Sequence, residues 1–385
     1  STPGWRVFHI DLNGDSRPDL VVIGADRDPD GGNRGFVDVF FQGEVGKFGN
    51  PSHYYKGLNG ANPRFVTIGD FDGNNKPDIA VSYNYDGAPT FGTLSVMWNK
   101  GDGTFSEPKL EVGNFTLLNS AGLGAGDFDG DGKSELVLLT EGLLTLQYVL
   151  VQKYDAAMKK FLGATPGATV GLPIGYAGTN LKIVDLNGDK IPDLIVERID
   201  TNKASELALY TTEKRAMPAD PFTFQERAKL AVPGVLGRVA VGELVAPAGL
   251  DVVRSVPATL MNGVSTPGSS VQLIPLMQVG AGPQFATPVT THAVGAAPFE
   301  LALGHYAGSS LVDVAVTHAV VPPCAGAGSC ATEQRIAVLI NNPSTGLPTM
   351  AGRLPELAVG SGDSTFLISV DIDGNGTMDL IAASM

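Results

Sequence analysis

The sequence predicts an all-β protein: a seven-bladed β-propeller of four-stranded blades whose last blade is incomplete. Three observations predict this fold. An acidic nine-residue loop occurs five times, the first four copies start 57 to 59 residues apart, and short β-branched or aromatic runs separated by Gly, Asn and Asp fill the intervals. An internal period of this kind is typical of a solenoid, a propeller or another repeat array. We find no convincing amphipathic helix in the sequence.

The loop has oxygen-bearing side chains at positions 1, 3, 5 and 9 and Gly at position 4 in every copy. A hard cation such as Ca²⁺ takes six to eight oxygen ligands in a flexible geometry. A tight turn directs side chains 1, 3 and 5 to one point, the carbonyl at position 7 can add an oxygen, and the acid at position 9 completes the set from the following strand. Gly at position 4 permits backbone geometry that other residues resist. An EF-hand is disfavoured because it needs a bidentate Glu at position 12 and flanking helices.

The sequence therefore predicts about five Ca²⁺ sites, with position 7 contributing through its backbone carbonyl. The predicted metal ligands are Asp11, Asn13, Asp15, Arg17 and Asp19; Asp70, Asp72, Asn74, Lys76 and Asp78; Asp127, Asp129, Asp131, Lys133 and Glu135; Asp185, Asn187, Asp189, Ile191 and Asp193; and Asp371, Asp373, Asn375, Thr377 and Asp379.

Two further copies of the loop are degenerate. Continuing the period from Asp185 leads to Glu243 and then to His305, and both copies keep an Asp at position 9, Asp251 and Asp313. Because they lack most of the other side-chain oxygens, we expect them to be metal-free, and we interpret His305 as part of a degenerate loop rather than as a zinc ligand. Seven units then cover a single propeller domain, residues 1–385. Their approximate bounds are 1–59, 60–117, 118–175, 176–233, 234–294, 295–360 and 361–385.

Each unit reads as four short strands. The first precedes the loop, as in Arg6–Ile10, and the second follows it, as in Asp19–Ile23. The third is apolar or alternating, as in Val37–Phe41, and the fourth is weaker, with a Phe or Met near its start, as at Phe48. A closed propeller removes most exposed sheet edges, which favours it over the alternative, an open solenoid.

The segment Asp70–Val81, followed by Leu94–Phe105, resembles the FG-GAP/VCBS repeat family. That family includes the integrin α-subunit propeller, seven-bladed lectins and propeller domains of secreted bacterial proteins. The resemblance implies Ca²⁺ in the turns that join the first two strands of a blade, held by the residues named above. The chain departs from the family in units five and six, and it stops soon after the second strand of unit seven. We therefore expect a longer natural chain or another polypeptide that completes the last blade by strand addition.

Composition excludes several classes of protein. The sequence has no run of eighteen apolar residues that could span a membrane. The net charge is −14, but sixteen of the 40 acidic side chains lie in the five loops, and five Ca²⁺ ions would leave about −4. Nucleic acid is disfavoured as a partner because phosphate binding needs clustered Lys and Arg.

The two cysteines, Cys324 and Cys330, are separated by Gly, Ala and Ser, so we expect a disulfide between them. A two-ligand metal site is the alternative, and no nearby His supports it. Together with calcium loops suited to extracellular concentrations, a disulfide predicts an extracytoplasmic location, secreted or at the cell surface.

No constellation of residues predicts catalysis, and we expect the protein not to be an enzyme. Three functions stay open: a protein–protein or cell-surface binding platform, a glycan-binding lectin, and the scaffold of a polysaccharide-active enzyme. For the lectin, Tyr83, Tyr85, Phe91 and Trp98 could stack on a sugar, as could Tyr54 and Tyr55, although Trp98 is better explained as core between blades. The partner is therefore expected to be a protein, a cell-surface component or a glycan.

Overall fold

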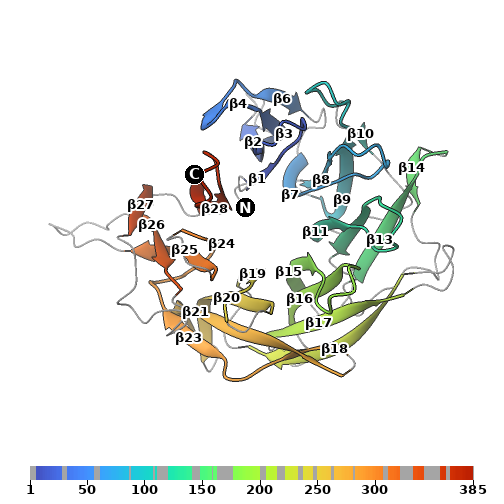
Figure 1. Ribbon diagram of the computed structural model, residues 1–385. Helices are drawn as coiled ribbons and strands as arrows, with labels where there is room; N and C mark the ends of the chain where they lie inside the picture. The colour runs from blue at the N-terminus through green and yellow to red at the C-terminus, as the bar shows by residue number, and fades with distance from the viewer. Residues whose placement is uncertain are drawn as a thin grey trace. The chain divides into compact units, whose positions relative to one another are not determined.

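The computed structural model describes an all-β chain (Figure 1). The described residues are 6–27, 33–55, 61–85, 88–106, 109–110, 120–140, 148–157, 159–162, 177–199, 205–214, 222–232, 237–245, 249–261, 264–280, 282–306, 311–320, 333–341, 356–360 and 365–384. They contain no helix, and hence none that could cross a membrane. The chain divides into two compact units, Ser1–Lys229 and Leu230–Met385.

The N-terminal unit begins with an eight-stranded sheet made of two antiparallel runs that are joined by one parallel pair, Arg34 with Ala61. The first run is β1 (Arg6–Ile10), β2 (Asp19–Arg27), β3 (Asn33–Phe40) and β6 (Ser52–Tyr55), and the second is β7 (Ala61–Gly69), β8 (Asp78–Tyr85), β9 (Ala88–Met97) and β10 (Lys109–Leu110). Two four-stranded antiparallel sheets follow. They are β11 (Ser120–Gly126), β12 (Glu135–Thr140), β13 (Tyr148–Asp155) and β14 (Lys160–Leu162), then β15 (Ala177–Val184), β16 (Asp193–Ile199), β17 (Ser205–Glu213) and β18 (Thr223–Ala231).

The C-terminal unit contains three sheets of decreasing size. The first has five strands, β19 (Val239–Gly242), β20 (Asp251–Met261), β21 (Val264–Val279), β22 (Gly282–Phe285) and β23 (Thr290–Ala293). The second has four, β24 (Leu301–Gly304), β25 (Asp313–Val320), β26 (Glu333–Leu339) and β27 (Leu357–Gly360), and the third is the pair β28 (Thr365–Val370) and β29 (Asp379–Ser384). These small antiparallel sheets in series are propeller blades, whereas the predicted number of seven blades with four strands each stays a prediction, as does the single domain.

Within each unit, the first strands of successive sheets contact one another. Strand β7 contacts β11, and β11 contacts β15; in the other unit β24 contacts both β19 and β28 (Figure 1). The sheets then pack face to face through apolar side chains. One core cluster joins Val21 and Val39 of the first run to Ile79 and Met97 of the second. Alternating apolar residues on each strand thus supply a hydrophobic layer between neighbouring sheets, the main source of stability.

The predicted first strands agree with the structure, but the edge of the first blade does not. We placed its fourth strand at Phe48, which instead belongs to a separate hairpin of β4 (Gln42–Glu44) and β5 (Lys47–Phe48). The strand that pairs with β3 is β6, with Val37 opposite Tyr54. The reason is packing: Tyr54 enters the apolar cluster between the sheets, whereas Phe48 is only half-buried.

Candidate metal-binding loops

All five acidic loops connect the first and second strands of a sheet and fold in the same way. The Asp at position 1 organises the turn. In the second loop, Asp70 Oδ1 accepts hydrogen bonds from the Gly73 and Asn74 amides at 2.8 and 3.0 Å, and Oδ2 accepts one from Asn75 at 2.7 Å. The amides at positions 4 and 6 make the equivalent bonds in the other four loops. One carboxylate therefore satisfies several backbone donors that a tight turn leaves unpaired.

Two residues of each loop adopt the left-handed backbone conformation. Gly at position 4 has φ between 71° and 83°, a backbone geometry that other residues resist, and this explains why Gly occurs there in every copy. Position 6 has positive φ as well, and three copies use a residue other than Gly there: Ser16 (65°), Asn75 (62°) and Lys190 (69°). This second left-handed position could not be predicted from the sequence, because the residue type there varies between copies.

The side chains at positions 3 and 5 also accept backbone hydrogen bonds. Asp72 Oδ1 accepts from the Asn74 amide at 3.1 Å, and Asn74 Oδ1 accepts from the Lys76 amide at 2.8 Å. Each such bond uses one lone pair, so the oxygens keep further capacity to coordinate a cation.

The acid at position 9 has a second structural role that the sequence did not reveal. In the second loop, Asp78 Oδ2 accepts from the amide at position 2, Phe71, at 3.2 Å, and Oδ1 accepts from Asn99, just beyond the third strand, at 2.8 Å. We call this arrangement the position-9 bridge. The same two bonds occur at four other acids, Asp19, Asp193, Asp251 and Asp313.

These acids are almost completely buried: Asp19, Asp78, Glu135, Asp193 and Asp313 have 0% exposure. The pKa of Asp78 is raised to about 7 and that of Asp193 to about 6, mainly by burial and also by neighbouring loop carboxylates, while the backbone hydrogen bonds act in the opposite direction. A buried carboxylate surrounded by other acids is costly to ionise unless a cation is near.

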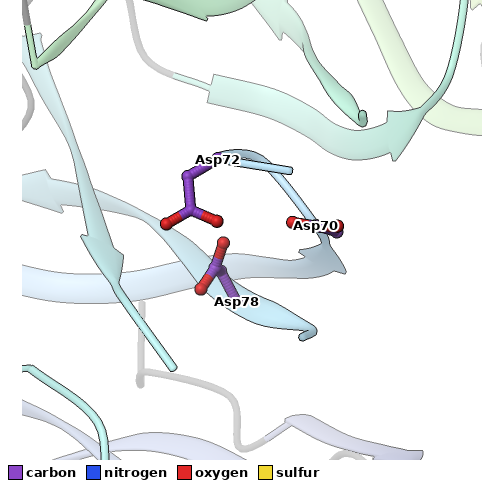
Figure 2. Close-up of side chains that lie close together, drawn as sticks. All are labelled: Asp70, Asp72 and Asp78. Carbon is purple, nitrogen blue, oxygen red and sulfur yellow. The ribbon is translucent and has the colours of Figure 1, made fainter. Parts of the chain in front are cut away.

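Three loops bring carboxylates from positions 1, 3 and 9 together, with the ligand atoms within 4.8 Å of one another. Figure 2 shows one of these groups, in which Asp70, Asp72 and Asp78 point toward a common centre. The other two groups are Asp127, Asp129 and Glu135, and Asp371, Asp373 and Asp379. This convergence of oxygens is the chemistry of a divalent-cation site. The carbonyl ligands predicted at position 7 stay a prediction.

The first and fourth loops have Asn at position 3 and Asp at position 5, so their third carboxylate lies at position 5 rather than at position 3. Asp15 at position 5 is held by Arg17 Nη2 at 2.5 Å. Asn187 Nδ2 donates to Asp189 Oδ2 at 3.0 Å. The predicted ligands are thus neighbours in both loops, but their side chains are paired with one another or with Arg17.

The two degenerate loops retain the bond between positions 2 and 9. Asp251 Oδ2 accepts from Leu244 and Val245 at 2.8 and 2.7 Å, and Asp313 accepts from Tyr306 and Asn341 at 2.9 and 2.7 Å. His305 Nδ1 lies 3.1 Å from the Leu311 carbonyl oxygen within its own loop.

Two asparagines connect one strand-connecting loop to the next. Asn99 Nδ2 donates to the Leu12 carbonyl of the preceding loop at 2.8 Å and to the Pro77 carbonyl of its own loop at 3.0 Å. Asn341 repeats this pattern in the C-terminal unit, with Leu244 and Val312. The signal in the sequence, an Asn just after an apolar strand, is too common to have been recognised.

The third loop differs from the other four in having a lysine at its centre. Lys153 extends from β13, and its Nζ lies 2.5 Å from Asp129 Oδ2, 2.6 Å from Asp131 Oδ2 and 3.4 Å from Glu135 Oε1. Burial alone would lower the pKa of Lys153, but its hydrogen bonds to Asp129 and Asp131 raise the pKa above its ordinary value. Lys153 therefore carries its charge at neutral pH.

Three of the six aromatic residues considered for sugar stacking, Tyr54, Tyr83 and Trp98, pack in the apolar layers. Tyr83 has 0% exposure, and Tyr54 lies in the same apolar cluster. Trp98 packs on Tyr154, with ring centroids 4.6 Å apart, and on Phe161. The expectation that Trp98 is core between blades is therefore confirmed. The side chains of Tyr55, Tyr85 and Phe91 lie outside the described part of the chain, as do Cys324 and Cys330, so the disulfide stays a prediction.

Comparison with known proteins agrees with the repeat. Residues 11–81 and 84–138 match the FG-GAP-like repeat family. No curated protein shows significant sequence similarity to the chain. Among solved structures, an exo-β-1,3-galactanase from Clostridium thermocellum aligns with 98% of this chain and 87% of its own, at 10% identity and a TM-score of 0.36. That similarity is too low to support an argument about fold or function.

Proposed function

We propose that this chain, which carries FG-GAP-like repeats at residues 11–138, is a calcium-stabilised, seven-bladed propeller that binds a protein or cell-surface partner outside the cytoplasm and is not an enzyme. The observation that supports calcium binding most strongly is the convergence of three carboxylates in the loops that begin at Asp70 and Asp371; the loop that begins at Asp127 has the same convergence, with Lys153 among its carboxylates. The two remaining acidic loops share the same backbone hydrogen bonds, so we assign them the same role.

Calcium acts in this proposal as a structural ion. The acids at positions 1, 3 and 9 repel one another when no cation balances them, and a bound ion removes this repulsion only in the folded state. Carboxylates held by a metal stay ionised and are poor proton donors, which argues against acid–base catalysis at the loops.

A glycan-binding function is the second candidate, and the scaffold of a polysaccharide-active enzyme is a third. The lectin is less favoured because Tyr54, Tyr83 and Trp98 are occupied in the apolar layers between sheets. A glycan array compares the first two functions directly. A saccharide that binds the protein, and no longer binds after an exposed aromatic is removed, would reverse this order.

Calcium titration of the chelated protein tests the structural role. Isothermal titration calorimetry should report several sites, and each should stabilise the fold by about 2.7 kcal/mol at a hundredfold excess over Kd. Chelation should accordingly lower the melting temperature. An unchanged melting temperature with and without chelator, together with no calorimetric signal, would contradict the proposal.

A further inference from the structure

We propose that Lys153 is a built-in cation that closes the third loop in place of calcium, so that this loop stays folded without an ion and binds calcium more weakly than the second and fifth loops. The inference rests on the proposed calcium role of those other loops. It concerns one side chain that comes from outside the loop sequence.

The position of the ammonium group is the first argument. Nζ of Lys153 lies at 2.5 and 2.6 Å from the carboxylates at positions 3 and 5, and 3.4 Å from that at position 9. Calcium would bind the same oxygens at about 2.3–2.6 Å. A calcium ion and this ammonium cannot share those oxygens without strong repulsion between the two cations, so calcium has to displace Lys153.

The second argument is the change at position 9, where the third loop has Glu instead of Asp. Glu135 Oε2 accepts from the Phe128 amide at 2.8 Å, as the acid at position 9 does in the other loops. Its Oε1 is buried and has no hydrogen bond in the described structure, although Lys153 lies 3.4 Å away. In the equivalent bridges of Asp19, Asp78 and Asp193, the second oxygen accepts an amide near the end of the third strand. The longer side chain of Glu135 thus directs its free oxygen at the lysine.

The third argument comes from the matching residues of the other sheets. Lys153 follows Gln152, which pairs with Leu136, and so lies beside Glu135. The same registers place Phe41, Trp98 and Thr211 beside the position-9 acids of the other three acidic loops in this unit. None of these three is charged. Among the four acidic loops of this unit, only the third has Glu at position 9, and only the third has a lysine beside that acid.

Hydrogen exchange measured by mass spectrometry tests this inference on the intact protein, with calcium and with chelator. In the wild type, the amides of Gly130 and Gly132 should keep the same protection in both conditions. The amides of Gly73 and Asn75 in the second loop should exchange about 100-fold more slowly at a hundredfold excess of calcium over Kd.

Two variants complete the test. Lys153→Met should make Gly130 and Gly132 lose protection in chelator and regain it with calcium, and calorimetry should count one additional strong site. If Lys153→Met does not fold, Lys153→Gln replaces it in the same test. Lys47→Met is the matched control, because the Lys47 ammonium also pairs with a carboxylate, Glu44 Oε2 at 2.6 Å, but lies outside the acidic loops. It should leave the number of sites unchanged.

The outcomes separate the two proposals. If the third loop of the wild type responds to calcium like the second, and Lys153→Met adds no site, the role of Lys153 is overturned while the calcium role of the loops stands. If no loop responds to calcium in any variant, the proposed function fails and the inference fails with it.

Discussion

Replacing Asp313 with alanine would separate the position-9 bridge from metal binding. Asp313 is fully buried and accepts from the amides of Tyr306 and Asn341 at 2.9 and 2.7 Å, in a loop that we expect to bind no ion. Hydrogen bonds to a charged group contribute about 1.5–3 kcal/mol each, so losing both should cost about 3–6 kcal/mol. That is a large fraction of the stability of a typical domain, which is about 5–15 kcal/mol.

The assay is urea denaturation of each variant with calcium and with chelator. Asp313→Ala should lower the midpoint equally in both conditions, and Asp313→Asn, which keeps one acceptor, should lose about half as much. Asp72→Ala is the comparison: its carboxylate accepts two exposed hydrogen bonds, both from Asn74, from the backbone amide at 3.1 Å and from side-chain Nδ2 at 3.2 Å. It should cost about 1 kcal/mol or less in chelator but about 2.7 kcal/mol more in a hundredfold excess of calcium. A loss for Asp313→Ala that appears only with calcium would refute the reasoning.

Three other predictions follow from the loops and the layers between sheets. In chelator, the protein should be more stable at pH 5 than at pH 8, because the pKa of Asp78 is raised from 3.8 to about 7 on folding and the stability that protonation provides is lost as pH rises through that range. Urea denaturation at both values checks this, and Asp78→Asn should flatten the difference. Gly69→Ala should cost about 1–3 kcal/mol, since the new Cβ would lie 2.7 Å from Ser134 Cβ on the next loop. A Cβ at Gly43 would have no atom within 4 Å, so Gly43→Ala should leave the melting temperature nearly unchanged. Thermal melts of both variants check this prediction. Asn99→Ala should cost about 1–3 kcal/mol in calcium and in chelator alike, because it leaves the Leu12 carbonyl without its amide donor; a calcium-dependent loss would speak against a purely structural contact.

The acidic loops could be predicted from the sequence because their structure is local. Asp at position 1 binds amides only three to five residues away, and Gly at position 4 has the left-handed conformation that its presence implied. The positions of the strands next to the loops could also be predicted, since apolar runs directly adjoin the acids. Both features depend on residue types at fixed, short separations.

The long-range contacts could not be predicted in this way. The second partner of the position-9 bridge is a backbone amide 19 to 28 residues away, and the residue that supplies it is Gln42, Asn99, Thr212, Leu276 or Asn341. An amide donor carries no signature in the sequence. Lys153 lies 22 residues beyond Asp131, on a strand whose register must be known before the two can be placed together.

The position-9 bridge also bears on how repeats of this kind change over evolutionary time. Since Asp313 makes both bonds in a blade without the other acids, substitutions that abolish ion coordination in one repeat need not disrupt the turn itself. Ligands can drift away blade by blade while the strands keep their registers. The number of ions that such a chain carries is then a poor guide to how many blades it has.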